Sequence, residues 1–451
     1  MTERLRIAIN AQLTSDDPSG GIVTVVRALA ALTELDGPEE YIFVGPYTDP
    51  EWLRPLLAPG QQIARGPKPQ PDWRGLDQRG HLERHLGPLR TAAQEVKQVL
   101  VHGTHFPVAE VLSRSDVARQ FKAILSRSFF DALGCDVVHF PFQAFEACSV
   151  PSVYNPHDLQ HLHFPRFFTQ EEFARRENVY PRACRDAHTV VVASQFVQQD
   201  VIKSYGIEAS KVQVIPWAPP PLTNFRETTD EKVHDIRIKY GLTQKPFALY
   251  PAMTWQHKNH LRLLEAFALL RKNQKLDLQI VCTGSKTDFW PMIEGRLKEL
   301  GLNEAVKFTG LIPIEELNVL YRAAQFVFVP TLFEAASAPI FEAWQHNAPV
   351  ACARVTSLPE QVQDAALQFD PLSVEEIVIA LARMNTERRL REDLRRRGAL
   401  RLRDFSLEQT AKAYRAVYRR AAGRKLNQED RHLLTCDWTR NNTQKFEATG
   451  G

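Results

Sequence analysis

The sequence lacks long apolar runs and any strong charge imbalance, and each absence excludes a class of protein. No apolar run reaches the roughly 18–20 residues that a membrane-spanning helix requires. The first ten residues, MTERLRIAIN, carry charges and lead directly into an apolar segment, so we expect no signal peptide. The formal net charge is +3, from 56 lysines and arginines against 53 acidic residues. Such a balance gives no general attraction to nucleic acids or to anionic membranes.

Cysteine is also scarce, and the cysteines are scattered without the short spacings of a metal site. We interpret them as reduced thiols in the core of a cytoplasmic protein. The six are Cys135, Cys148, Cys184, Cys282, Cys352 and Cys436.

The length of 451 residues exceeds one ordinary core, so we expect two domains. In both halves, short apolar runs alternate with amphipathic segments, which is typical of parallel sheets covered by helices. We therefore predict an α/β protein with two Rossmann-like domains. The predicted parts are an N-terminal domain at 1–218 with an irregular basic insertion at about 65–130, a linker at 219–245, a C-terminal domain at 246–405, a further helix at 406–423, and a tail at 424–451 that we expect to fray.

The most informative stretch is P-T-L-F-E-A-A-S-A-P-I-F-E-A, residues 330–343. A buried strand leads into it, and Ser337 is expected to cap a helix that has Pro339 in its first turn. A helix N-terminus just after a buried parallel strand offers free N–H groups to a phosphate. Glu334 and Glu342 flank this turn, and because they would repel the anion, we expect them to accept hydrogen bonds from hydroxyls. The alternative is a pair of surface acids without a ligand.

A second polar run, N-P-H-D-L-Q-H-L, follows the strand predicted at 152–155. Polar groups at the carboxyl end of a parallel strand lie where ligands bind in open α/β sheets. His157 is therefore a candidate site residue, the alternative being a loop histidine without a role. We interpret His161 and His163 as structural and leave both possibilities open for His139.

Three further segments are candidates for contacts with an anionic ligand. Lys258, in M-T-W-Q-H-K-N-H after the strand at 247–252, can neutralise a phosphate or can simply be solvated. Gly20 and Gly21, after the first strand, allow the backbone to approach a ligand or form a plain loop. The basic insertion, with amphipathic helices predicted at 89–100 and 116–130, either meets an anionic acceptor or membrane surface or is an ordinary solvated face.

Taken together, these blocks resemble the retaining GT-B glycosyltransferases of family 4. Residues 330–343 look like the motif of that family in which seven residues separate two glutamates, and the run around His157 is similar to its H-D-L-Q-H signature. T-W-Q-H-K-N, S-L-P-E-Q-V and L-Y-R-A-A also resemble family segments. Two departures stand out. Ala335 and Ser337 occupy positions that are usually glycine, which predicts a less permissive turn, and no arginine stands a few residues before Lys258.

The resemblance implies two facing Rossmann-like domains with a C-terminal helix that crosses back onto the N-terminal domain. It also implies retaining transfer of a hexose from a nucleotide-diphospho-sugar to a saccharide, lipid-linked or other acceptor, without a cofactor. Mannose from GDP-mannose is favoured because the H-D-L-Q-H branch is similar to mannosyltransferases, and a UDP-sugar is the other expected donor. We expect no metal, because no Asp-x-Asp signature is present.

The resemblance further implies roles for individual residues. Glu342 would hold the ribose and Glu334 the hydroxyls of the sugar, while Lys258 would neutralise the diphosphate. His157 would lie beside the reacting sugar, so the expected catalytic residues are His157, Glu334 and Lys258. The remaining donor-binding positions are Gly20, Gly21, Thr254, Trp255 and the backbone N–H groups of Ala336, Ser337 and Ala338.

Two other functions are compatible with the same fold. A nucleotide-sugar 2-epimerase also binds its substrate between two such domains, although the context of the two glutamates argues against it. A catalytically silent GT-B subunit that binds a partner is the third possibility. We expect no nucleic-acid partner, whereas peripheral contact with the inner membrane face stays open.

Overall fold

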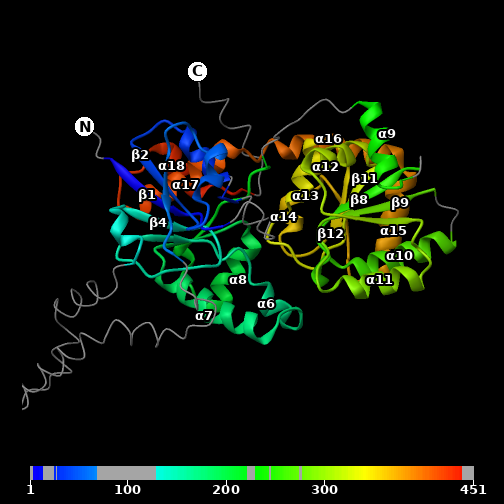
Figure 1. Cartoon of the computed structure of the whole chain (residues 1–451), viewed down its shortest axis with the longest axis horizontal. Coiled ribbons are helices and arrows are strands. Elements are labelled where there is room, and N and C mark those ends of the chain that lie inside the picture. Colours follow the sequence, from blue (N-terminus) through cyan, green and yellow to red (C-terminus); the bar gives the residue numbers. More distant parts are fainter. Residues whose placement is uncertain are drawn as a thin grey trace, which may run out of the picture.

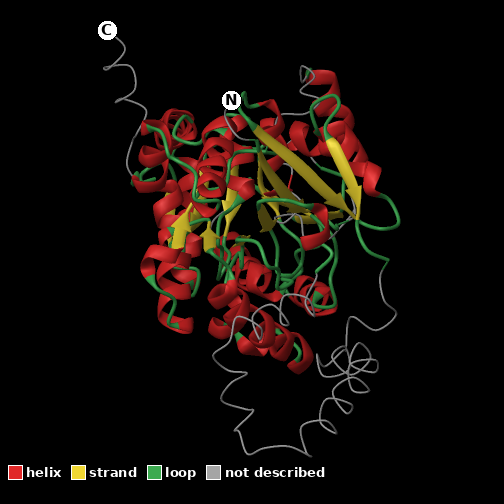
Figure 2. Ribbon diagram, turned by 90° about the vertical axis from the view of Figure 1, so that its left-hand side faces the viewer, coloured by secondary structure: helices red, strands yellow, loops and turns green. Residues whose placement is uncertain are grey.

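The computed structural model describes residues 4–13, 25–26, 28–68, 128–220, 229–242, 245–273 and 277–438. The described chain forms two halves, each built on a parallel sheet with helices around it (Figures 1 and 2). No helix among the described residues is long and apolar enough to cross a membrane. The predicted helices at 89–100 and 116–130, and the Gly20-Gly21 turn, lie outside the described residues, apart from 128–130.

The N-terminal sheet has the strand order β3-β2-β1-β4-β5-β6-β7, and all its neighbouring strands run parallel. Its inner strands were predicted, because they are apolar on both faces. The short edge strand β3, with the sequence QIAR, was missed because it is half exposed and carries no apolar run. The strands are β1 (Leu5–Asn10), β2 (Glu39–Gly45), β3 (Gln62–Arg65), β4 (Val137–Phe140), β5 (Ser152–Tyr154), β6 (Thr189–Val192) and β7 (Val212–Val214).

The C-terminal sheet has the order β10-β9-β8-β11-β12-β13 and is parallel throughout. In both sheets the strand order reverses once, between β1 and β4 and between β8 and β11. Ligands of open α/β sheets bind outside the carboxyl ends of the strands at such a reversal. The strands are β8 (Phe247–Pro251), β9 (Gln279–Thr283), β10 (Val306–Gly310), β11 (Phe326–Val329), β12 (Val350–Ala353) and β13 (Leu367–Phe369).

Helices complete both halves and bury the apolar strands in cores on the faces of the sheets. In the N-terminal half they are α6 (Gln160–His163), α7 (Gln170–Asp186) and α8 (Gln195–Tyr205). In the C-terminal half they are α9 (Asp230–Lys239), α10 (His260–Asn273), α11 (Trp290–Glu299), α12 (Ile314–Ala323), α13 (Ala338–Gln345), α14 (Leu358–Val362), α15 (Val374–Thr386) and α16 (Arg388–Leu402).

The last two helices, α17 (Leu407–Ala421) and α18 (Gln428–Thr435), return to the N-terminal half, where they lie beside β1 and β2 (Figure 1). Tyr414 and Tyr418 of α17 are buried in the core of that half. The Arg419 guanidinium lies 2.7 Å from a carboxylate oxygen of Glu39, which precedes the apolar part of β2. The two parallel-sheet domains and the crossing helix confirm the predicted architecture.

Two sequence-based boundaries were wrong. The tail does not fray at 424, because Asn427 and Asp430 form a capping box that starts α18 and the side chain of Leu433 is buried. The linker is shorter than predicted, since α9 occupies 230–239 and its Ile236 belongs to the C-terminal core. Both segments are polar overall, and only a few apolar side chains anchor them, which is a weak signal in the sequence.

Candidate active site

The loops that follow β8 and β11 meet at the reversal point of the C-terminal sheet. Lys258 comes from the first loop and Glu334 from the second, and Lys258 Nζ lies 2.6 Å from Glu334 Oε1. Their side chains are only 20% and 12% exposed. The sequence predicted both residues as donor contacts, but not that they pair with each other. The charges of the two side chains therefore neutralise each other.

The turn between Glu334 and α13 does not need glycine. Ser337 has φ −116° and ψ 103°, and neither Ala335 nor Ala336 has a positive φ. Any L-residue adopts such angles, so alanine and serine fit this turn without backbone strain. Ser337 stands at the N-cap of α13 as predicted, but its hydroxyl makes no capping hydrogen bond.

The backbone of this turn is held by the segment 356–361, which follows β12. Glu334 N–H donates to Thr356 Oγ1 over 3.1 Å, and the Glu334 carbonyl accepts from the hydroxyls of Thr356 and Ser357, each at 2.7 Å. Ser337 N–H donates to Gln361 Oε1 over 2.8 Å, and Gln361 Nε2 donates to the Ser337 carbonyl over 2.9 Å. Of the N–H groups predicted to meet a diphosphate, that of Ser337 is therefore already engaged.

Glu342 lies on α13 and is half-buried. Tyr321 of α12 donates a hydrogen bond to Glu342 Oε2 over 2.5 Å. Burial raises the pKa of Glu342, and the hydrogen bond from Tyr321 opposes that rise. Tyr321 fixes one carboxylate oxygen and leaves the other for a ligand. Its role was missed, although it belongs to the L-Y-R-A-A segment.

His157 follows β5 with a left-handed backbone, φ 65°, which is uncommon outside glycine although histidine adopts it more often than most residues. Its Nε2 lies 2.8 Å from the Pro141 carbonyl oxygen, so Nε2 carries the proton and Nδ1 has the lone pair. Burial lowers the pKa of His157, which keeps the ring neutral. Its edge meets Trp217, with ring centroids 6.2 Å apart. The imidazole can therefore accept one hydrogen bond from a hydroxyl through Nδ1.

His139 belongs to a buried network behind His157. Asn155 Nδ2 donates to Tyr414 over 2.9 Å, so its Oδ1 accepts from His139 Nε2–H over 2.8 Å. His139 Nδ1 then accepts from the Tyr418 hydroxyl over 2.7 Å. Complete burial lowers the pKa of His139 to about 3. The network ties the ends of β4 and β5 to α17, which gives His139 a structural role.

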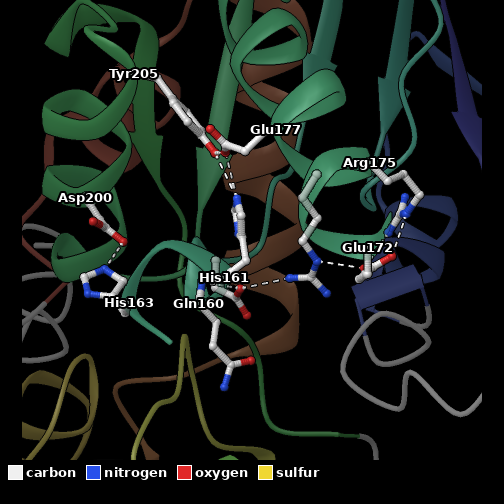
Figure 3. Close-up of polar contacts among 10 residues, drawn as sticks. Gln160, His161, His163, Glu172, Arg175, Glu177, Asp200 and Tyr205 are labelled. Carbon is white, nitrogen blue, oxygen red and sulfur yellow. Dashed lines mark hydrogen bonds and ion pairs between the residues drawn. The ribbon is translucent and has the colours of Figure 1, made fainter. Parts of the chain in front are cut away.

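His161 and His163 lie among α6, α7 and α8 in hydrogen bonds with acids (Figure 3). His161 Nε2 lies 2.9 Å from Glu177 Oε1, to which Tyr205 also donates. His163 Nε2 lies 2.8 Å from Asp200 Oδ2. These contacts fit the structural roles that we expected for both histidines.

The remaining predicted donor contacts are Thr254 and Trp255 in the β8 loop. Thr254 is buried, and its Oγ1 accepts a hydrogen bond from Thr287 N–H over 2.7 Å, which joins this loop to the one after β9. Trp255 is 46% exposed, a large apolar surface beside Lys258. Among the described residues, no group of three or more His, Cys, Asp or Glu side chains is placed to hold a metal ion.

The two halves touch at the same turn. Phe333 of the C-terminal half packs against the N-terminal rings of His163, Phe164 and Phe196, with centroids 5.3–6.2 Å apart. Next to this contact lies a cavity of about 210 Å³ whose walls come from both halves, with Ala335 and Ala336 on one side and Trp217 on the other. The candidate site residues thus come from both halves. Glu334 and Lys258 do not line this cavity themselves but lie in the loops of the C-terminal half, and His157 meets it through the ring of Trp217.

Comparison with known proteins agrees with this geometry. A family described as glycosyl transferases group 1 matches residues 233–401, and one described as Glycosyltransferase Family 4 matches residues 19–218. HepE from Anabaena, solved in complex with UDP and glucose, has a TM-score of 0.63 and 17% identity over 92% of this chain and 99% of that one. That likeness shows the GT-B fold.

Two curated relatives are mannosyltransferases by name. O-antigen chain mannosyltransferase B of Escherichia coli is 27% identical over 266 residues, which are 58% of this chain and 69% of that protein. MMP alpha-(1->4)-mannosyltransferase of Mycolicibacterium hassiacum is 26% identical over 249 residues, or 54% of this chain and 56% of that protein. The chain thus spans little more than half of the second relative. With one family match on each half, the GT-B fold and these relatives, the chain belongs to the group 1, family 4 glycosyltransferases.

Proposed function

We propose that the protein is a retaining, metal-independent hexosyltransferase that moves mannose from GDP-mannose to a saccharide or lipid-linked acceptor. The observation that carries the proposal is the meeting of Lys258, Glu334 and the α13 N-terminus at the reversal point of the C-terminal sheet. The choice of mannose is supported by the names of the relatives. A UDP-sugar is the alternative donor, and the UDP complex of a structural neighbour favours it.

The proposed chemistry requires that the leaving diphosphate be stabilised as it gains charge. When the diphosphate enters, the Lys258 ammonium exchanges its carboxylate partner for a phosphate oxygen, and the N–H groups of Ala336 and Ala338 complete the anion site. The released Glu334 carboxylate accepts hydrogen bonds from the sugar hydroxyls. Positive character that develops on the ring in the transition state is then stabilised by this nearby negative charge.

His157 and Glu342 hold the two ends of the donor in this proposal. His157 Nδ1 accepts the hydrogen bond of the primary hydroxyl of the sugar, and the free oxygen of Glu342 accepts from the ribose. The leaving phosphate takes the proton of the acceptor hydroxyl on the same face of the sugar. The new bond therefore forms on the face from which the old one breaks, which retains the configuration.

The test is incubation of the protein with GDP-mannose, and in parallel with UDP-glucose, without acceptor and in excess EDTA. We expect slow release of GDP from GDP-mannose as water replaces the acceptor. A 2-epimerase would instead return an isomerised donor, and a silent subunit would return the donor unchanged. Activity that disappears in EDTA and returns with magnesium or manganese would refute metal independence.

A further inference from the structure

Glu360 makes a direct polar contact between the two halves. It belongs to α14 of the C-terminal half, and its carboxylate reaches the N-terminus of α8 in the N-terminal half. Gln195 N–H donates to Glu360 Oε2 and Phe196 N–H donates to Glu360 Oε1, both over 2.9 Å. These are the first two residues of α8, whose N–H groups have no partner within the helix.

The cap of α8 is shared between the two halves. Ser194 of the N-terminal half accepts only the third N–H group, that of Val197, over 3.3 Å. The carboxylate of Glu360 supplies the acceptors for the first two. A negative charge at this end also interacts favourably with the helix dipole. The N-terminus of α8 is therefore completely capped only when the two halves are together.

The backbone of Glu360 is held rigidly. Arg401 of α16 is buried, and its guanidinium donates to the carbonyls of Glu360 and Gln361, each over 3.0 Å. It also pairs with Asp404, at 2.8 Å. Glu360 therefore cannot follow α8 if the halves separate, and opening must break both hydrogen bonds.

The same segment, 356–361, also holds the turn between Glu334 and α13, which we call the donor turn. Gln361, the next residue, makes the two hydrogen bonds to the backbone of Ser337, and Thr356 and Ser357 hold the backbone of Glu334. One short segment therefore contacts the proposed donor site through Thr356, Ser357 and Gln361. It contacts the opposite domain through Glu360. The ring of Phe196, whose N–H binds Glu360, also packs against Phe333 in the donor turn.

We propose that Glu360 is a positioning residue that holds the closed arrangement of the two domains, and that it thereby sets the donor turn opposite His157. The claim that Glu360 sets the donor turn rests on the proposed transferase function, whereas the claim that it holds the two domains together does not. Alanine at position 360 leaves both helix N–H groups uncapped in the closed form, whereas glutamine keeps one acceptor oxygen but loses the negative charge and the second acceptor. The open form should then become more populated, and the donor should be positioned less often for transfer.

The experiment compares Glu360→Gln and Glu360→Ala with wild-type protein and with Glu304→Gln. Glu304 is a C-terminal-half acid that is 96% exposed, so its variant controls for the loss of one charge. Hydrogen exchange is measured at the amides of Gln195 and Phe196, with the Val197 amide, capped by Ser194, as an internal reference. Scattering gives the radius of gyration, and GDP-mannose hydrolysis gives kcat and the donor KM.

For both Glu360 variants we expect exchange at Gln195 and Phe196 to quicken by about ten-fold or more relative to Val197, with a larger radius of gyration. The value of kcat should fall by about ten-fold, while bare GDP binds with unchanged affinity, because its proposed site lies within the C-terminal half. Unchanged exchange at both amides would overturn the interdomain contact. Faster exchange with unchanged kcat and KM would overturn the positioning role. If no donor is turned over by the wild type, the transferase proposal fails, but exchange and scattering still decide whether Glu360 holds the domains.

Discussion

The proposed division of labour between Glu334 and Glu342 predicts opposite kinetic effects for two chemically identical substitutions. In Glu342→Gln, the ribose loses a charged acceptor that it uses in the ground state and in the transition state alike. A hydrogen bond to a charged group contributes about 1.5–3 kcal/mol, which corresponds to roughly 10–150-fold in affinity. We therefore expect weaker binding of both GDP-mannose and bare GDP, with a raised KM and a nearly unchanged kcat.

Glu334→Gln should behave in the opposite way. Its carboxylate is proposed to act on charge that develops only in the transition state, so kcat should fall by about 10²-fold, which equals about 2.7 kcal/mol. The contact with Lys258 adds a second expectation for this variant. Because Glu334 Oε1 lies 2.6 Å from Lys258 Nζ, a phosphate that binds Lys258 must compete with this carboxylate. Removal of that competing charge should leave the affinity for GDP unchanged or make it higher.

The assay is isothermal titration with GDP beside steady-state kinetics on both variants. The closest control is Glu304→Gln, which removes a carboxylate from the surface of the same half. If Glu334→Gln weakens GDP binding while Glu342→Gln preserves it, the two roles are exchanged. In that case the proposed orientation of the donor along α13 is wrong.

Two further predictions concern stability and pH. Burial raises the pKa of Glu342, so the ionised carboxylate opposes folding. Glu342→Gln should therefore raise the melting temperature at pH 7–8. This gain should disappear as the pH falls below 4.5, where the carboxyl is protonated in both the folded and the unfolded chain. A melting temperature that is unchanged or lower at pH 7–8 would contradict this. Burial lowers the pKa of His139 from 6.5 to about 3. The free energy of unfolding is therefore not reduced by this group above pH 6.5, and it falls as the pH drops below that value, because only the unfolded chain binds the proton. Between pH 7 and pH 5 this one group should cost about 2 kcal/mol. Denaturant titrations at both pH values should show that the wild type loses about 2 kcal/mol more of its free energy of unfolding than His139→Gln does. Equal losses in the two proteins would refute the assignment.

The sequence predicted the sheets well because their strands are buried on both faces and read as short apolar runs. The motif around Glu334 also predicted a helix N-cap at Ser337, since the turn is local and its neighbours set it. The edge strand β3 and the helices α9 and α18 were missed or misplaced. In each of these elements only one side is anchored by apolar residues, so the pattern is too weak to distinguish it from a loop.

The pairings within the candidate site could not be predicted in this way. Lys258 and Glu334 are 76 residues apart, and Tyr321 of α12 meets Glu342 of α13, which lies 21 residues further along the chain. The left-handed backbone of His157 could not be predicted either, because histidine adopts this conformation more often than most residues but still uncommonly. The conformation of the turn at Ser337 could not be predicted either, and its φ of −116° is one that serine adopts without strain.

The site residues of each half are held by residues that come from far along the chain. This explains which residues the motifs could reveal and which they could not. Asn155, two residues before His157, is fixed by Tyr414 from the crossing helix. In the C-terminal half, the backbone of Glu334 is fixed by Thr356. Thr356 belongs to the same segment as Glu360, which reaches the N-terminal half. A motif contains the residues that face a ligand because they lie together on one loop. The residues that orient them lie on other elements, so only the folded arrangement brings them into view.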